Sequence, residues 1–199
     1  MRKRHRTVLA VIVVAVMIGA VTWRILRARE PVFEGKELSV WLEGYQISRH
    51  KVGSLQRNKA DEAMRDAGTN AMPTLLRMLR AHDSPLKLKL LNLAQRQKLI
   101  RVNYVPASAK KYTAGVAFGT LGSAASNAVP ELIRIYQQDS SLQTRNAIII
   151  ALGHIGPPAR DAIPLLLEAA GSTNIPLRAN SANTLKAIDG EAAAKPGVR

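Results

Sequence analysis

One short phrase occurs three times in this chain and restricts its fold more than any other feature. The phrase is Asn or Asp, then Ala, an aliphatic residue, Pro and a leucine-rich run, and its copies begin at Asn70, Asn127 and Asp161. The last two copies lie 34 residues apart, and each has a glycine eight residues before its proline. A fixed period of this length is typical of stacked supersecondary units that bury their apolar faces only against one another. The sequence therefore predicts a helical solenoid.

Each copy of the phrase has the composition of a helix start. An Asn or Asp side chain can accept a hydrogen bond from a free amide of the first turn, and proline is tolerated there because that turn lacks intrahelical partners anyway. Upstream, Gly122 and Gly156 can end the preceding helix, because glycine readily adopts the left-handed conformation. Each unit is thus predicted to be a helix, a glycine-containing turn and a capped second helix. The string 145–155 matches 178–188 at a shift of 33 residues, which predicts a further, truncated unit.

The composition supports this fold class and excludes some chemistry. The chain has two Phe, four Tyr and two Trp among 199 residues, whereas sheets favour aromatic and β-branched side chains. Cysteine is absent, which excludes disulfide frameworks, zinc–thiolate sites and cysteine nucleophiles. The histidines at positions 5, 50, 82 and 154 are too far apart for a metal-ligand or catalytic-triad motif. We therefore predict no catalytic, metal-binding or cofactor-binding residues.

The N-terminal segment differs from the rest of the chain. Five basic side chains, counting His5, precede an uncharged run from Thr7 to Trp23, and three arginines follow it. A membrane-spanning helix needs about 17 to 25 apolar residues, and the run reaches this length over residues 8–26 if Arg24 snorkels. We expect an uncleaved transmembrane anchor here. The alternative is a signal peptide cleaved at Ala20, which would give a secreted protein.

The distribution of basic residues around this run predicts its orientation. More basic side chains precede the run than follow it, and Glu30 stands on the following side. Because cytoplasmic flanks carry the excess of lysine and arginine, we expect a cytoplasmic N-terminus and an exported C-terminal domain, on the periplasmic side in a bacterium.

The chain divides into four segments. We expect a basic leader with an anchor helix at 1–29, a connector with a capping helix at 30–58, repeats at 59–190 with a basic helical insert at 84–111, and a tail at 191–199.

Two features of the connector and the first repeat refine this division. Trp41 lies at helical spacing among other apolar residues, and we expect it to seal the open end of the stack rather than to bind a ligand. The polar stretch 48–58 is predicted to be a loop before a first repeat helix at 59–67. Gly68 lies only five residues before its proline, so the first turn should be tighter than the others.

The insert has the strongest charge asymmetry of the chain. The first two copies of the phrase are separated by 23 residues more than the later period. Ser84 and Pro85 predict a helix start, with the helix reaching about Ile100. No acidic residue occurs in 84–130. The basic residues of that stretch are Lys87, Lys89, Arg96, Lys98, Arg101, Lys110 and Lys111.

Three interpretations of this basic patch remain open. It can be a solvated helix face, a surface for anionic lipid headgroups, or a site for nucleic acid. Nucleic acid is the least favoured partner, because only Tyr104 and Tyr112 are available for stacking and no recognition motif is present.

The strings 121–133 and 151–170 resemble the inter-helix turn and second helix of HEAT-type repeats. The string 31–42, directly after the apolar run, is similar to the same region of membrane-anchored bacterial HEAT-repeat proteins of unassigned function. The resemblance covers about residues 31–189. It implies an all-α fold, a right-handed α–α superhelix of the armadillo type, used as a protein-binding scaffold without catalytic residues.

The leading functional hypothesis is therefore a non-catalytic, membrane-tethered protein-interaction scaffold. Its partner should bind the helices that follow the three phrases, where we expect exposed side chains. The candidate contacts are Arg77, Arg80, Arg134, Tyr136 and Glu168. Two alternatives are a lipid- or polyanion-binding surface on the insert, and a lyase-like enzyme or maturation factor built on the same repeats.

Overall fold

A computed structural model describes residues 14, 30–47, 53–96 and 104–190. The chain separates into two units, Met1–Glu30 and Pro31–Arg199. In the part of the chain that the structure describes, no helix has both the length and the apolar character needed to span a bilayer. The predicted anchor at residues 8–26 lies outside the described residues except for Val14, which is helical and exposed.

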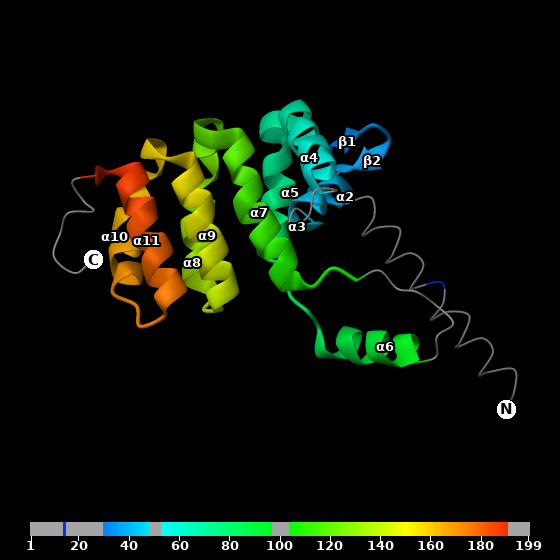
Figure 1. The fold of residues 1–199 in the computed structure, drawn as a ribbon. Coiled ribbons are helices and arrows are strands. Elements are labelled where there is room, and N and C mark those ends of the chain that lie inside the picture. Colours follow the sequence, from blue (N-terminus) through cyan, green and yellow to red (C-terminus); the bar gives the residue numbers. More distant parts are fainter. Residues whose placement is uncertain (1–13, 15–29, 48–52, 97–103, 191–199) are drawn as a thin grey trace, which may run out of the picture. The chain divides into compact units, whose positions relative to one another are not determined.

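The second unit is built from helices, with one small hairpin at its start (Figure 1). The hairpin and first helices are β1 (Val32–Phe33), β2 (Lys36–Glu37), α2 (Leu38–Leu42) and α3 (Gly44–Ile47). The paired helices are α4 (Gly53–Ala67) with α5 (Met72–Leu79), α7 (Ala107–Leu121) with α8 (Val129–Gln138), and α9 (Leu142–Ile155) with α10 (Ile163–Ala170). Helix α6 (Pro85–Arg96) lies between the first two pairs in sequence, and α11 (Ile175–Ile188) follows the last.

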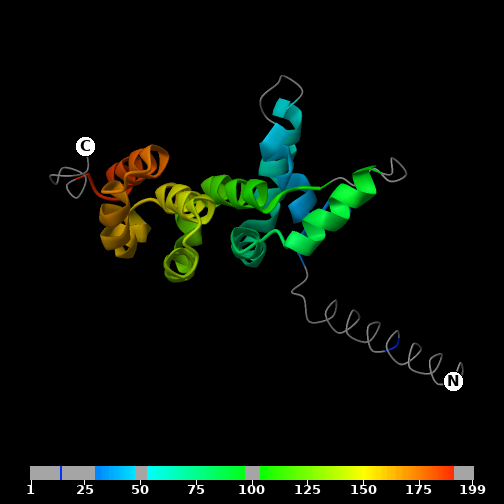
Figure 2. The ribbon, with the colours of Figure 1, turned by 90° about the horizontal axis from the view of Figure 1, so that it is seen from below.

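The helix pairs stack in the order of the sequence. The first helices of the pairs pack side by side, α4 on α7, α7 on α9 and α9 on α11, and the second helices α5, α8 and α10 form another layer (Figure 2). One apolar cluster runs through all the pairs, with Phe118, Ile148 and Leu152 among its fully buried side chains. This stack is the helical solenoid that the repeated phrase predicts.

The glycine turns agree with the sequence prediction. Gly68, Gly122 and Gly156 have φ values of 50°, 52° and 75°, in the left-handed region that favours glycine. A 3₁₀ helix follows each turn: η1 (Gly68–Ala71), η2 (Gly122–Ala128) and η3 (Pro157–Ala162). The first is the shortest, which confirms the tighter first turn.

The predicted capping of the second helices is wrong. The N-cap residues of α5, α8 and α10 are alanines, none of which offers a side-chain acceptor. The capping residues predicted from the phrase, Asn70, Asn127 and Asp161, lie within the 3₁₀ helices instead. Backbone carbonyls of the 3₁₀ helices replace the side-chain caps, as when Met72 N donates to Thr69 O. The prolines do occupy the first turns of these helices, as predicted.

Side-chain capping is found at the first helices. Ser141 Oγ accepts from Thr144 N in α9, and Asn174 Oδ1 accepts from Leu177 N in α11 at 3.0 Å. In α7 the acceptor comes from far along the chain, because Ala107 N donates to both carboxylate oxygens of Asp83 at 3.0 and 3.1 Å.

Two predicted boundaries need correction. Helix α4 begins at Gly53 rather than Lys59, so the predicted loop is wrong for residues 53–58. The insert ends at Pro106 rather than at residue 111, because α7 begins at Ala107. The corrected insert, 84–106, has the 23 residues by which the first spacing exceeds the later period.

The connector packs on the first repeat. Trp41 Nε1 donates to Phe33 O at 2.8 Å, and the two rings meet edge to face at 5.9 Å. Tyr45 Oη donates to Asp61 Oδ1 at 2.5 Å and lies 3.1 Å from Thr120 Oγ1. These contacts join α3 to α4 and α7, at the end of the stack where we expected a capping helix.

Candidate interaction surface

The predicted contact residues lie on or directly after the second helices. Arg80, Arg134 and Glu168 are exposed, and Arg77 is half-buried. Tyr136 is only 4% exposed, so the expectation that it faces solvent is wrong. The guanidinium group of Arg145, on α9, lies 4.9 Å from the centre of the Tyr136 ring.

Two of these arginines share one carboxylate, which the sequence had not singled out. Arg134 binds Glu131 through two hydrogen bonds, Nη2 to Oε1 at 2.6 Å and Nε to Oε2 at 2.8 Å. Arg80, directly after α5, pairs with the same Glu131 of α8. The charge cluster Arg80–Glu131–Arg134 therefore crosses from one repeat to the next and carries one net positive charge.

A groove opens beside this cluster, after the ends of α5 and α8. The volume of the groove is about 450 Å³. The residues that line it are Arg80, His82, Ile135, Gln138, Asp139 and Ser140. Five of these six residues have polar side chains, and charged groups of both signs are among them.

A network of hydrogen bonds next to the groove holds the Asp139 side chain in place. Lys111 Nζ, in a side chain that is almost fully buried, donates to Thr144 Oγ1 at 2.6 Å and to Asp139 Oδ2 at 3.2 Å. Thr144 Oγ1 also donates to Asp139 Oδ2 at 2.5 Å, and Ser141 N donates to Oδ1 at 2.8 Å. Lys111 thus belongs to the packing of α7 on α9, and its placement in an exposed basic patch is wrong.

The electrostatics of Asp139 limit the chemistry of this site. Burial raises the pKa of the carboxyl, but hydrogen bonds from Thr144, Ser141 and Lys111 outweigh burial and hold the pKa of Asp139 well below its usual range. His82 Nε2 lies 3.4 Å from Asp139 Oδ2. A carboxylate held this firmly in its ionised form is a weak proton acceptor near neutral pH. The network is therefore suited to joining helices and fixing the groove wall.

The described members of the predicted basic patch lie on two different helices. Lys87 and Lys89 are exposed on α6, and Lys110 is half-buried on α7. Lys87 Nζ lies 4.8 Å from the centre of the Tyr104 ring. Lys98, Arg101 and the side chain of Arg96 lie outside the described residues. Among the described side chains of the predicted patch, two are therefore exposed on α6 and one is half-buried on α7.

The remaining titratable groups are dispersed. Among the described residues, no group of three His, Asp or Glu side chains could hold a metal ion. His154 lies over Gly119 of the preceding repeat, and burial lowers its pKa. His5 and His50 fall outside the described residues.

Comparison with known proteins bears on the repeats. The family model for HEAT repeats matches residues 129–196, about a third of the chain, starting at α8. No curated protein and no solved structure matches. The family match and the stacked helix pairs together support a HEAT-repeat protein.

Proposed function

We propose that this protein is a non-catalytic interaction scaffold, which binds a protein partner on the face formed by α5, α8 and α10. HEAT repeats commonly mediate protein interaction, and stacked repeats offer extended surfaces to a partner. The observation that carries the proposal is the Arg80–Glu131–Arg134 cluster beside the groove, because it spans two consecutive repeats.

The charge of this surface favours a partner with acidic side chains. Glu131 neutralises only one of the two guanidinium groups that it contacts, and the Arg134 side chain is 54% exposed. Arginine is a frequent anchor in protein interfaces because its planar group binds carboxylates through two hydrogen bonds. An acidic partner side chain can therefore bind the outer edge of Arg134 without displacing Glu131.

The proposal includes a membrane tether through residues 8–26, with the repeat domain on the exported side. Its support is the uncharged run and the surplus of basic residues before it. The same proposal includes the right-handed superhelix that the resemblance to membrane-anchored bacterial HEAT-repeat proteins implies. Protease protection of the repeat domain in sealed right-side-out membranes would contradict this orientation.

Site-specific photo-crosslinking in the cells that produce the protein tests the binding surface. A photoreactive residue replaces Gln137 on α8 or Glu168 on α10, and matched probes replace Gln143 on α9 or Lys186 on α11, all four being exposed positions. We expect partner crosslinks from the first two positions and none from the last two. Arg134→Glu should reduce the Gln137 crosslink about tenfold, since it reverses a charge in the interface.

The opposite patterns overturn the proposal. Crosslinks confined to the first-helix positions would place the partner on the other layer. Equal crosslinking at all four positions, unaffected by Arg134→Glu, would show nonspecific proximity rather than binding.

A further inference from the structure

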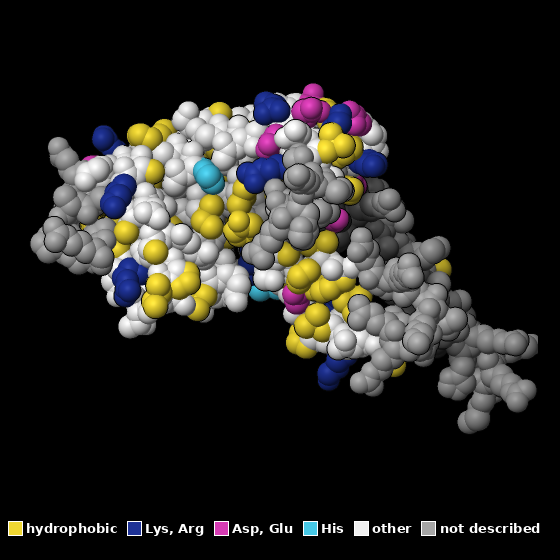
Figure 3. Space-filling model, viewed as in Figure 1, with side chains coloured by type: hydrophobic (Ala, Val, Ile, Leu, Met, Phe, Trp, Pro, Cys, Tyr) yellow, Lys and Arg dark blue, Asp and Glu magenta, His cyan; other side chains and the backbone are white. Residues whose placement is uncertain are grey.

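Helix α6 exposes an unusual amount of apolar surface. Leu86, Leu88, Leu90 and Leu93 are 67%, 40%, 58% and 56% exposed. Hydrophobic side chains gather on the surface where α6 lies (Figure 3). Single exposed leucines are common in soluble proteins, whereas a contiguous exposed group marks a surface that binds something.

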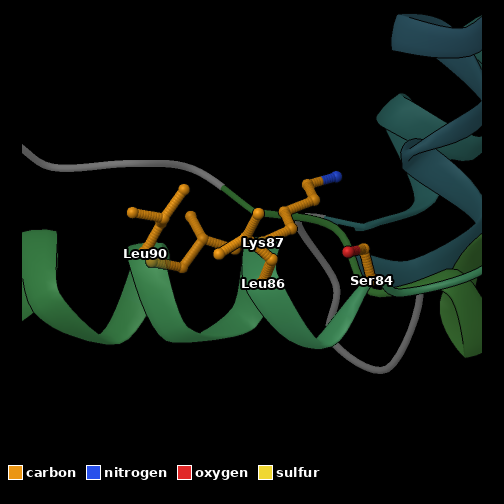
Figure 4. Close-up of a pocket in the computed structure, with 5 residues that line it drawn as sticks. Ser84, Leu86, Lys87 and Leu90 are labelled. Atoms are coloured by element: carbon orange, nitrogen blue, oxygen red, sulfur yellow. The ribbon is translucent and has the colours of Figure 1, made fainter.

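The leucines are arranged along the helix and not only at one end. At about 100° per residue, Leu86, Leu90 and Leu93 form one stripe. Leu86 and Leu90 extend from successive turns of α6, with Lys87 between them in sequence (Figure 4). An open hollow along this stripe is lined by Ser84, Leu86, Lys87, Leu90 and Leu91. A binding partner can therefore contact this surface along the length of α6.

The charge around this stripe has one sign. Lys87 and Lys89 are exposed, and the sequence 84–130 contains no acidic residue. Asp83, the nearest acidic residue before the helix, is engaged by Ala107 N and Tyr104. Asp83 also attracts Lys87 from the start of the helix, whereas the described residues provide no such partner for Lys89. Apolar surface flanked by lysines complements a surface that is apolar inside and anionic outside.

We propose that α6 binds the surface of a lipid bilayer that contains anionic lipids. The leucine stripe enters the boundary of the acyl chains, while Lys87 and Lys89 reach the phosphate groups, as in other basic interfacial helices. This site is separate from the α5–α8–α10 face, and it adds a lipid contact made by the repeat domain itself.

Charge argues against a second copy of the chain as the occupant. Two α6 helices packed together would bring lysines close to lysines, and the insert 84–106 supplies no carboxylate to separate them. Like charges in contact oppose such pairing. A bilayer with anionic lipids offers both apolar contact for the leucines and negative charge for the lysines.

The absence of cysteine allows a position-specific test in the full-length chain. Leu90→Cys carries an environment-sensitive fluorophore on α6, and Gln143→Cys carries it at an exposed position of α9 as the control. The labelled proteins are mixed with vesicles of phosphatidylcholine alone or with added phosphatidylglycerol. We expect a blue shift and a several-fold gain in emission at position 90 with the anionic vesicles only, and no change at position 143.

The probe reports on α6 whichever other segment of the chain also binds lipid. Lys87→Gln/Lys89→Gln should weaken the anionic-vesicle response about 30-fold, since each basic side chain near the surface contributes about fivefold. Lys87→Arg/Lys89→Arg keeps the charge and should keep the response. A probe at position 86 guards against a local effect of replacing Leu90.

Three results would overturn the proposal. They are no shift at positions 86 and 90 with anionic vesicles, an equal shift with phosphatidylcholine alone, and a shift without lipid that grows with protein concentration. The last result would identify self-association. Since none of these measurements involves the α5–α8–α10 face, failure here is distinguishable from failure of the scaffold proposal.

Discussion

Single glycines set how closely neighbouring repeats pack. A Cβ built on Gly115 of α7 would lie 2.6 Å from Ala147 O in α9, and backbone cannot move aside easily. One built on Gly119 would meet only the His154 ring, at 3.2 Å. We expect Gly115→Ala to destabilise the protein by about 1–3 kcal/mol, although Gly→Ala in a helix normally stabilises by about 1 kcal/mol. Gly119→Ala should be neutral or stabilising. Urea unfolding measures both, and equal effects of the same sign would contradict the close packing.

The Lys111–Asp139 pair predicts unequal effects of removing its two members. Asp139→Asn leaves an almost fully buried ammonium without its counter-ion and should cost about 2–3 kcal/mol in the free energy of unfolding. Lys111→Met keeps the aliphatic packing and leaves Asp139 bonded to Thr144 and Ser141, so we expect a loss of about 1 kcal/mol. Denaturant unfolding at neutral pH measures both changes, and a larger loss for Lys111→Met would contradict the argument.

The same network predicts a dependence of stability on pH. The folded-state pKa of Asp139 lies below its usual value of 3.8. A depressed carboxyl pKa contributes stability that is present above the unfolded pKa and is lost as the pH falls through the folded one. The free energy of unfolding should therefore decrease as the pH is lowered below about 4. This decrease should be smaller in Asp139→Asn. Unfolding curves between pH 2 and 7 give the comparison, and parallel pH profiles would exclude Asp139 as the source.

The sequence contains part of this residue-scale information. Lys111, Ala114 and Phe118 have the i, i+3, i+7 spacing of one helix face, and all three are buried. That spacing could have separated Lys111 from the exposed lysines. Its partner could not be predicted, because Asp139 is brought to it only by the packing of α7 on α9.

At the scale of elements, the insert 84–106 is a long connection between α5 and α7, and a hydrogen-bonded contact of Asp83 with Ala107 joins its two ends. The Asp83 carboxylate precedes the insert and accepts from Ala107 N directly after it. Replacing residues 84–106 with Gly-Ser-Gly should therefore preserve the helical fold. Shortening the loop should also stabilise the protein by up to about 2 kcal/mol through its smaller closure entropy. Circular dichroism and thermal unfolding test this, and a loss of cooperative unfolding would show that α6 supports the stack.

Element types were more predictable than the details of their ends. Glycine turns and first-turn prolines follow from backbone conformations that few residues can replace, so Gly122, Gly156 and the prolines could be assigned from sequence. The Asx caps could not, because an Asn before a helix looks the same whether it caps the helix or lies in a preceding 3₁₀ turn. The exposure of the α6 leucines could not be predicted from the sequence either, since a leucine-rich helix normally packs in a core.

At the scale of the whole repeat domain, the period of the phrase predicted which helices are neighbours. The strings matched at a shift of 33 residues lie in α9 and α11, which pack on each other. The interaction surface was less predictable. Its carboxylate, Glu131, is one of 14 acidic side chains in the sequence. The groove needs the ends of two helices that the insert separates along the chain.

Because each repeat packs mainly on its neighbours, damage at one end of the stack should remain local. Helix α11 buries Leu177, Leu185 and Ile188, and Thr184 Oγ1 donates to Ile149 O in α9 at 3.0 Å. A chain ending at Gly171 should lose amide-exchange protection in α9 and α10 while α4 keeps most of its own, since stability in a repeat stack is a sum of nearest-neighbour terms. A chain ending at Gly190 retains α11 and is the matched control. Uniform loss of protection from α4 to α10 would mean that the stack unfolds as one cooperative unit, so that lost contacts in α11 destabilise every helix equally.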